Sequence, residues 1–329
     1  ISPSTDTPPS PVHRYHTHDL LAQGAMGRIL LAQDRFLSRR VAFKEIRSEL
    51  RGQAHILNGF LTEAQITAQL EHPGVIPVYT MEQHEDSSLA YTMKLVNGNT
   101  LKEELHQLKS DLDKGLSAAQ WQQAYRRLVE LFLVVCDTLD YAHNKGIVHR
   151  DLKPSNIMIG SYNEVYVLDW GIAARQDPPP SENTMQAVQL SLTPDTLPAG
   201  YIAGTPKYMS PEQAYGRPEA LRATSDLFSL GLILYELTFL HQAFQGKDMK
   251  TLLHNVRHNQ QVSEVPAFPQ IKAPAEMVAI IRKATRRTIS QRYASVAAMA
   301  QDIRAWLNDQ PTQALPDTLP RKLLRWTRH

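Results

Sequence analysis

The sequence predicts an α+β fold with two lobes, a small one rich in β-strand and a larger one that is mostly helical. Short alternating apolar runs fill the region from Tyr15 to Tyr91, which is the pattern of half-buried strands. After Gly98 the apolar residues recur at helical spacing instead. The chain has 329 residues, of which 42% are hydrophobic and 21% charged, so it is long enough to bury a sizeable core.

Four strands and one helix are expected in the first lobe. The strands are predicted at residues 28–34, 39–46, 76–83 and 88–96. The helix lies between the second and third strands, within residues 59–74, and is expected to stop at the sequence His72-Pro73-Gly74. One face of this helix is predicted to carry Phe60, Ala64, Thr67 and Leu70.

The second lobe is expected to begin with two helices. They are predicted at 100–110 and 119–146, separated by a polar loop at 111–117. Strands at 156–160 and 165–171, a loop at 175–203 and further helices up to 307 follow. The expected domain limits are a disordered leader at 1–13, the first lobe with a hinge at 14–96, the second lobe at 97–308 and a basic, proline-interrupted tail at 309–329.

The composition argues against several classes of function. A net charge of +2 gives no reason to expect a nucleic-acid partner, and no zinc site is expected from the 13 histidines. No run of about 18 apolar residues is present, so no segment of this sequence is expected to cross a bilayer. The single cysteine, Cys136, excludes a disulfide within the chain. It is expected on a buried helix, as part of the hydrophobic core. The chain begins at Ile1, which indicates a piece of a longer protein and leaves open a membrane anchor elsewhere.

Eight consecutive residues carry the strongest chemical signal. They are His149-Arg150-Asp151-Leu152-Lys153-Pro154-Ser155-Asn156, which fit the pattern H-R-D-L-x-x-x-N. In that pattern the aspartate accepts the proton of a substrate hydroxyl and the asparagine holds a metal ion. Asp169, in Leu168-Asp169-Trp170-Gly171, supplies a carboxylate for Mg²⁺ at the end of a strand. Each motif alone is compatible with a polar turn, but the two together at this spacing indicate phosphoryl transfer.

With these motifs the sequence resembles the eukaryotic-type (Hanks) serine/threonine protein kinases, in the form found in bacteria, over residues 15–307. Within that group it looks most like the chlamydial and planctomycete kinases. The resemblance implies the bilobal protein kinase fold and transfer of the ATP γ-phosphate to Ser or Thr hydroxyls of proteins, with Mg²⁺ or Mn²⁺ as the metal ion. The residues it places around the acceptor hydroxyl and the metal are Asp151, Lys153, Thr205, Asn156 and Asp169.

The resemblance also assigns residues to the nucleotide. Val41-Ala42-Phe43-Lys44 stands in the place of the V-A-I-K strand, so Lys44 is expected to reach the α- and β-phosphates and to be held by Glu63. The glycine loop keeps Gly24 and Gly27 but has Ala22 at the first glycine position, which is expected to weaken nucleotide binding slightly. The residues expected around adenine are Ile29, Ala42 and Met158 as ring contacts, Met93 as the gatekeeper, and the backbone of Lys94 and Val96.

The downstream motifs are expected to be structural. Residues 204–212, with the sequence GTPKYMSPE, resemble the P+1 loop and the A-P-E motif, with Ser in place of Ala. Glu212 is expected to form a buried ion pair with Arg292, and Asp226 is expected to anchor the backbone of the catalytic loop. Trp170 replaces the usual Phe and is expected to alter how its loop packs.

Arg150, directly before Asp151, indicates control by phosphorylation. In kinases with this pair a phosphate on the activation segment commonly binds the arginine and orders the segment. Autophosphorylation is therefore expected within residues 169–212, in trans if two copies associate. The candidate acceptors are Ser181, Thr184, Ser191, Thr193 and Thr196. The domain is expected in the cytoplasm, with residues 320–329 either a weak membrane-surface contact or a solvated tail.

Two other functions are compatible with the same fold. A pseudokinase or scaffold usually lacks one of the residues that are all present here, namely Lys44, Glu63, Asp151, Asn156 and Asp169. A small-molecule kinase of the aminoglycoside or choline type shares the lobes and the metal ligands but lacks the GTPxYxxPE segment. The sequence therefore favours a protein kinase over both.

Overall fold

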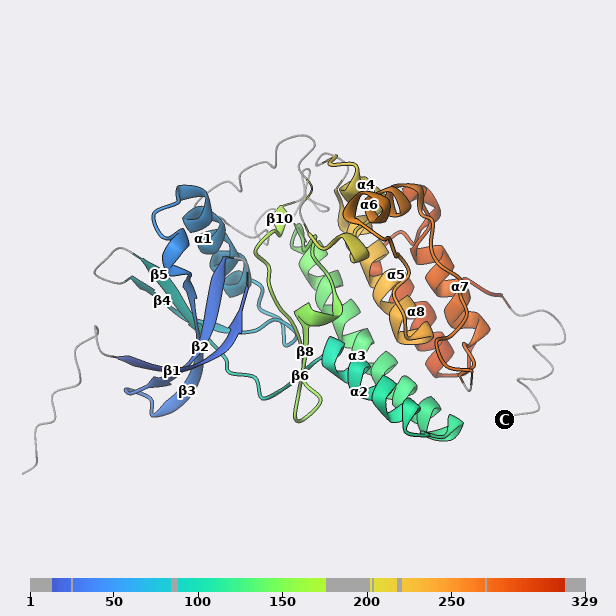
Figure 1. The fold of residues 1–329 in the computed structure, drawn as a ribbon, viewed down its shortest axis with the longest axis horizontal. Helices are drawn as coiled ribbons and strands as arrows, with labels where there is room; N and C mark the ends of the chain where they lie inside the picture. Colours follow the sequence, from blue (N-terminus) through green and yellow to red (C-terminus); the bar gives the residue numbers. More distant parts are fainter. Residues whose placement is uncertain are drawn as a thin grey trace, which may run out of the picture. The chain divides into compact units, whose positions relative to one another are not determined.

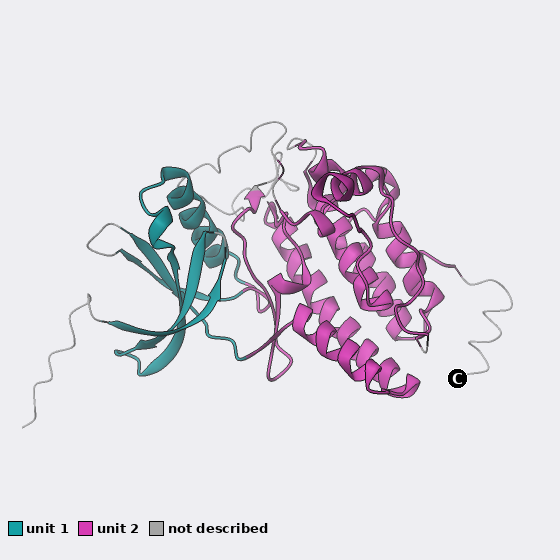
Figure 2. Cartoon of the chain, in the orientation of Figure 1, with its two compact units in different colours: residues 1–71, 76–97, 190–194 teal, residues 72–75, 98–189, 195–329 magenta. Residues whose placement is uncertain are grey.

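The computed structural model describes residues 14–24, 26–83, 88–175, 202, 204–217, 221–269 and 271–316. The described residues form two compact units, which Figure 2 distinguishes by colour. The first unit contains those of 14–71 and 76–97, and the second contains 72–75 together with those from 98 onward. The predicted leader at 1–13 and most of the predicted tail, 317–329, lie outside the described residues.

The first unit is built on an antiparallel sheet of five strands in the order β1-β2-β3-β5-β4 (Figure 1). The strands are β1 (Tyr15–Gln23), β2 (Gly27–Asp34), β3 (Arg39–Ile46), β4 (Val78–Gln83) and β5 (Leu89–Met93). A short 3₁₀ turn at Ser48–Leu50 leads into α1 (Ala54–Gln69), which packs against β4. The hydrophobic core of the sheet consists of Ala32, Val41, Phe43 and Ala90.

Helix α1 begins at Ala54, earlier than predicted, and the predicted buried face is confirmed. Phe60, Ala64, Thr67 and Leu70 are all at most 5% exposed. The helix ends at Gln69, shortly before the expected stop, and residues 72–75 belong to the second unit. There Val167 donates its backbone N–H to the Gly74 carbonyl at 2.8 Å. A side chain at Gly74 would lie 1.9 Å from the Thr138 hydroxyl, so only glycine allows this close approach.

The second unit is mostly helical. Its helices are α2 (Leu101–Asp113), α3 (Ala118–Asn144), α4 (Pro211–Ala214), α5 (Ala223–Phe239), α6 (Met249–His258), α7 (Ala275–Ala284) and α8 (Val296–Leu307). Two small sheets accompany them, one of β6 (Gly98–Thr100), β8 (Ile157–Gly160) and β9 (Val165–Val167), and one of β7 (Ile147–Val148) and β10 (Ala174–Arg175). Short 3₁₀ turns occur at Pro154–Asn156, Pro206–Tyr208 and Ile289–Gln291.

Helix α5 forms the centre of the second unit. Every residue from Ser225 to Phe239 is buried, because the helix is apolar on nearly all sides and contacts α3, α7, α8 and β7. Cys136 on α3 is fully buried as predicted, and burial raises the pKa of its thiol. The packed core around α5 gives the catalytic loop a rigid support.

The predicted polar loop at 111–117 is partly wrong, because α2 continues through Asp113. Leu112 is buried and extends the apolar face formed by Leu101, Leu105 and Leu108. Burial of this face therefore favours continuation of the helix through Asp113. Both neighbouring helix starts are fixed by reciprocal caps, Thr100 with Glu103 for α2 and Ser117 with Gln120 for α3.

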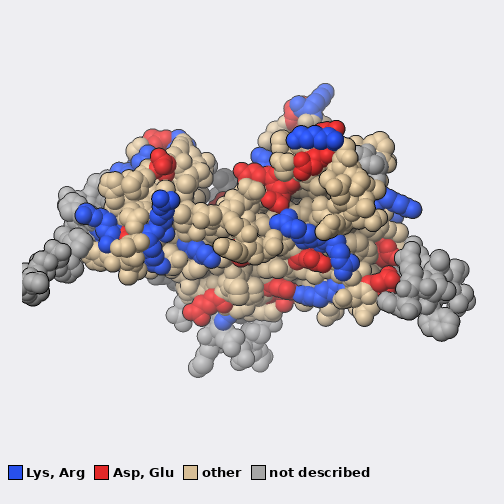
Figure 3. All heavy atoms as spheres, turned by 90° about the horizontal axis from the view of Figure 1, so that it is seen from below, with Lys and Arg blue, Asp and Glu red and all other residues tan. Residues whose placement is uncertain are grey.

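The surface reflects the near-balance of charges in the sequence. On the face drawn in Figure 3, Lys and Arg side chains are interspersed with Asp and Glu. Among the described residues, no helix combines the length and the apolar character that a membrane crossing requires.

Candidate active site

Asp151 lies at the centre of a cluster of hydrogen bonds in the second unit. One carboxylate oxygen, Oδ1, accepts hydrogen bonds from the backbone N–H and the hydroxyl of Thr205, both at 2.8 Å. The other, Oδ2, accepts one from the Lys153 ammonium at 2.5 Å, and the same ammonium donates to the Thr205 hydroxyl at 2.9 Å. Thr205 is far from Asp151 in the sequence, so the fold brings together all three residues predicted around the acceptor hydroxyl.

The backbone just before Asp151 is held by hydrogen bonds to Asp226 of α5. The Asp226 carboxylate is 1% exposed and accepts hydrogen bonds from the backbone N–H groups of His149 and Arg150, each at 2.8 Å. A third bond of 2.8 Å comes from Nε2 of His143. Burial raises the pKa of Asp226, but the hydrogen bonds and the nearby histidines outweigh burial and hold that pKa below its ordinary value. The predicted anchor is therefore present.

His149 connects the catalytic loop to the turn that contains Asp169. The backbone N–H of Asp151 donates to Nδ1 of His149 at 3.2 Å, so Nε2 carries the ring proton and donates to the Leu168 carbonyl at 2.9 Å. The Trp170 ring packs on this histidine with 4.7 Å between ring centroids, and it is 1% exposed. The large aromatic residue in place of Phe thus fills the space between the two motifs.

The two predicted metal ligands have suitable donor atoms. Asn156 donates through Nδ2 to the Asp151 carbonyl at 3.0 Å, which leaves its Oδ1 as the atom for a cation. Asp169 is exposed and has a φ of 62°, and Arg150 has a φ of 70°. Backbone of this kind costs about 1–3 kcal/mol in non-glycine residues and is concentrated at functional sites. One amide oxygen and one carboxylate fit Mg²⁺, which binds proteins through few oxygen ligands and completes its shell with phosphates and water.

In the first unit, Lys44 of β3 and Glu63 of α1 form the predicted ion pair. The Tyr91 hydroxyl donates to the same Glu63 oxygen at 2.9 Å, and the side chains of Lys44 and Glu63 are 14% and 6% exposed. The carboxylate thereby holds the ammonium in one position. Ala22 is paired with Ile29 in the extended conformation of β1, so its position does not require the φ that only glycine adopts easily.

The residues predicted around adenine in the first unit occupy neighbouring strands. Ala42 of β3 pairs with Met93 of β5, and both side chains are buried. The Lys94 N–H donates to the Pro77 carbonyl at 3.1 Å, so the backbone group of Lys94 that is suited to a ligand is its carbonyl, as an acceptor. Ile29 of β2 is paired with Lys44 of β3. Met158 belongs to β8 of the second unit.

The predicted ion pair between Glu212 and Arg292 is present and buried. The two guanidinium nitrogens bind the two carboxylate oxygens at 2.8 and 2.9 Å, and the Ser225 hydroxyl adds a third bond at 2.8 Å. Burial raises the pKa of Glu212, but the hydrogen bonds from Arg292 outweigh burial and hold that pKa below its ordinary value.

Acid is therefore expected to destabilise the second unit. Groups whose folded-state pKa is lowered stabilise the protein above their ordinary pKa, here 3.8 for Asp226 and 4.5 for Glu212, and this stabilisation is lost as the pH falls through the folded-state values. All four tryptophans lie beyond residue 98, so tryptophan fluorescence during urea unfolding reports on this unit. The unfolding free energy should fall steadily below about pH 4.5, and less steeply in the Glu212→Gln variant. Equal slopes for both proteins would contradict the assignment.

Three contacts in the second unit were not anticipated from the sequence. The Gln213 side chain donates to the Arg150 carbonyl at 2.7 Å, and the Tyr208 hydroxyl donates to the buried Glu236 at 2.5 Å. His254 and His258 have the H-x-x-x-H spacing on α6, with 4.2 Å between ring centroids. Among the described residues no group of three or more His, Cys, Asp or Glu side chains that could hold a metal ion is present.

Comparison with known proteins agrees with this geometry. The model of the protein kinase domain matches residues 15–303. The chain belongs to the protein kinase domain family. Its relatives include a serine/threonine-protein kinase PknD of Protochlamydia amoebophila, 36% identical over 289 residues, an alignment that covers 87% of this chain and 29% of the relative. The PknD kinases of Chlamydia pneumoniae and Chlamydia trachomatis serovar D are each 33% identical, and the alignments cover 94% of this chain and 33% of each relative.

This kinase domain thus spans about a third of the length of the relatives it matches. The predicted α+β bilobal kinase fold and the resemblance to bacterial Hanks-type kinases of chlamydial type are both confirmed. Membership of the family implies use of ATP with a divalent metal ion and protein substrates.

Proposed function

We propose that this kinase domain transfers the γ-phosphate of ATP to Ser and Thr hydroxyls of proteins. The observation that carries the proposal is the cluster in which Lys153 and Thr205 hold the Asp151 carboxylate. A carboxylate fixed in this way orients a hydroxyl and accepts its proton, and the adjacent ammonium stabilises the negative charge of the transferred group. The names of the PknD relatives support Ser and Thr as acceptors.

The other predicted site residues are proposed to act on the nucleotide and the metal ion. Lys44, held by Glu63, orients the α- and β-phosphates, and Gly24 and Gly27 let the backbone approach them. Asn156 and Asp169 hold Mg²⁺ or Mn²⁺, which neutralises the charge of the phosphates. The adenine contacts proposed are Ile29, Ala42, Met93, Lys94, Val96 and Met158, and Ala22 is proposed to lie in the glycine loop at the nucleotide.

Regulation by autophosphorylation is proposed on the basis of Arg150. Its Nε is buried and, within the described residues, has no hydrogen-bond partner. Burial and the neighbouring positive charge of Arg222 lower the pKa of Arg150, although Asp226 opposes them. An added phosphate would accept a hydrogen bond from the Arg150 Nε–H and would balance the positive charges of Arg150 and Arg222. The predicted acceptors between 181 and 196 lie outside the described residues. The proposal includes trans-autophosphorylation by self-associated copies and a cytoplasmic location.

The proposal is tested by intact mass after incubation with Mg²⁺ and ATP. The parent is expected to gain one or more phosphate masses, and the Asp169→Asn variant, which loses a metal ligand, is expected to gain none. Peptide mapping then identifies the sites, and a generic Ser/Thr substrate such as casein tests transfer to another protein. Failure of the parent to phosphorylate either itself or casein with Mg²⁺ or Mn²⁺, while it still binds ATP, would instead support the pseudokinase.

A further inference from the structure

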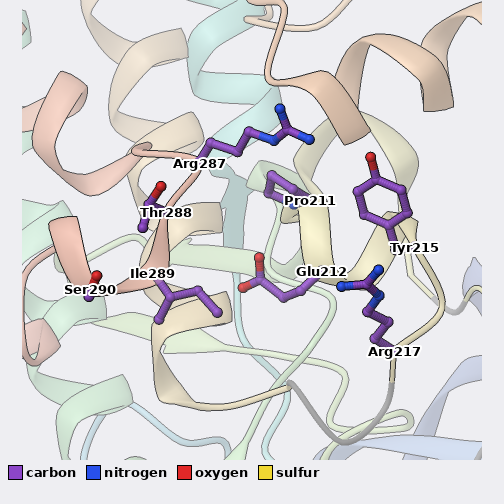
Figure 4. Close-up of a pocket in the computed structure, with 8 residues that line it drawn as sticks. All are labelled: Pro211, Glu212, Tyr215, Arg217, Arg287, Thr288, Ile289 and Ser290. Carbon is purple, nitrogen blue, oxygen red and sulfur yellow. The ribbon is translucent and has the colours of Figure 1, made fainter.

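A pocket outside the proposed active site lies in the second unit, between α4 and the segment that follows α7 (Figure 4). Its volume is about 600 Å³, within the range of ordinary ligand pockets. Pro211, Glu212, Tyr215 and Arg217 form one wall, and residues 287–290 form the other. None of the residues that the proposed phosphoryl transfer uses lines it.

The pocket carries an excess of positive charge. Arg217 and Arg287 lie on different sides of it, with Pro211 and Glu212 between them (Figure 4). Both arginines are exposed, and neither forms an ion pair with another described residue. Arg257 does not line the pocket: its guanidinium lies 5.7 Å from the Tyr215 ring centroid, and its Nε donates to the Ala214 carbonyl at 2.8 Å. The one carboxylate of the pocket, Glu212, already binds Arg292 through both of its oxygens. An anion that enters the pocket therefore meets arginines rather than a free carboxylate.

The same pocket has an apolar part and two hydroxyl groups. Tyr215 and Ile289 are among the exposed large hydrophobic residues of the chain, at 37% and 38% exposure. Thr288 and Ser290 supply hydroxyl donors beside Arg287. Guanidinium groups combined with hydroxyls bind phosphate through several charge-assisted hydrogen bonds, and the apolar surface suits the side chains on either side of a phosphorylated residue.

The pocket is next to a hydrogen bond that reaches the catalytic loop. Glu212 lines the pocket, while its neighbour Gln213 binds the Arg150 carbonyl at 2.7 Å. The short helix α4 carries both residues, so the pocket and the catalytic loop contact the same helix.

We propose that this pocket binds a phosphorylated serine or threonine segment of a protein substrate. This inference rests on the proposed function, in which the kinase domain produces such segments; the site would then retain a substrate that has been phosphorylated once and favour its next phosphorylation. Two guanidinium groups on different sides of a cavity match a phosphate dianion better than the single charge of a carboxylate.

Binding can be measured by fluorescence anisotropy with a fluorescein-labelled peptide, Gly-Leu-phosphoSer-Phe-Gly, in the absence of ATP. The parent is expected to bind it at least about tenfold more tightly than the same peptide with Ser or Asp in place of phosphoserine. The double variant Arg217→Gln/Arg287→Gln is expected to lose about tenfold in affinity for each arginine. Since both side chains are exposed, its melting temperature and its activity on unphosphorylated peptide should match the parent.

The matched control is Lys102→Gln/Lys272→Gln, which removes the same charge from exposed positions of the second unit away from the pocket. It should bind the phosphopeptide as the parent does, and so should the Asp151→Asn variant if the peptide is not in the active site. Equal binding by the parent and the Arg217/Arg287 double variant overturns the proposal. Equal binding of the phosphoserine and Asp peptides overturns phosphate as the ligand, and loss of binding in Asp151→Asn places the peptide at the active site instead.

Discussion

Replacement of Asp151 by Asn is expected to lower kcat for phosphoryl transfer by about 10²–10⁴-fold, the usual contribution of a positioned base. The amide keeps the size of the side chain but cannot take a proton. The amide NH₂ must also take the place of one carboxylate oxygen, at a position where Thr205 or Lys153 now donates. The cluster therefore loses at least one hydrogen bond. Steady-state transfer to a Ser peptide measures the loss, and ATP binding should change little because Asp151 is assigned to the acceptor.

Asp113→Asn provides the control for this experiment. Asp113 is exposed at the end of α2, and its replacement removes the same charge outside the cluster around Asp151. Its kcat should equal that of the parent. If Asp151→Asn keeps activity within a few-fold of the parent, Asp151 is not the base. If instead the loss lies in the affinity for ATP, its role is in nucleotide binding.

The part of the site predicted best from the sequence is the part encoded in short segments. Asp151, Lys153 and Asn156 lie within six residues of one another, so once the motif is recognised their proximity follows from the chain itself. Lys44 and Glu63 come from different elements, and their pairing was expected only through the resemblance to kinases. The hydrogen bonds that join Thr205 to Asp151 show that the same resemblance also predicts contacts between distant segments.

The features that were missed depend on packing between elements. Strand β6 is only three residues long and has no alternating pattern, so it exists because β8 lies beside it. The end of α2 was placed too early because the polar residues around Leu112 masked its buried stripe. The bond from Gln213 to the Arg150 carbonyl requires α4 to pack on the catalytic loop, and no local pattern indicates that. The left-handed backbone of Arg150 and Asp169 is likewise imposed by their surroundings.

Replacement of Asp226 by Asn should have the largest effect on stability. The carboxylate now accepts three hydrogen bonds in a fully buried site, and the amide has only one acceptor oxygen. At least one buried N–H group of His149 or Arg150 then lacks an acceptor, so the free energy of unfolding of the second unit is expected to fall by about 3 kcal/mol. Urea unfolding followed by tryptophan fluorescence measures this change.

The same substitution should also reduce kcat, because the groups that lose their acceptor are the backbone N–H groups directly before Asp151. A displacement of about 1 Å at a reacting group costs up to about 10²-fold in rate. Ser229→Ala is the matched control: Ser229 is buried one turn further along α5 and donates to the Tyr208 and Ser225 carbonyls, but it does not bind the catalytic loop. It should cost about 1 kcal/mol and leave kcat unchanged. If both variants lose equal stability and both keep full kcat, Asp226 is only a core residue. A lower kcat for Asp226→Asn alone, measured at a temperature where both variants are folded, would show that α5 positions Asp151.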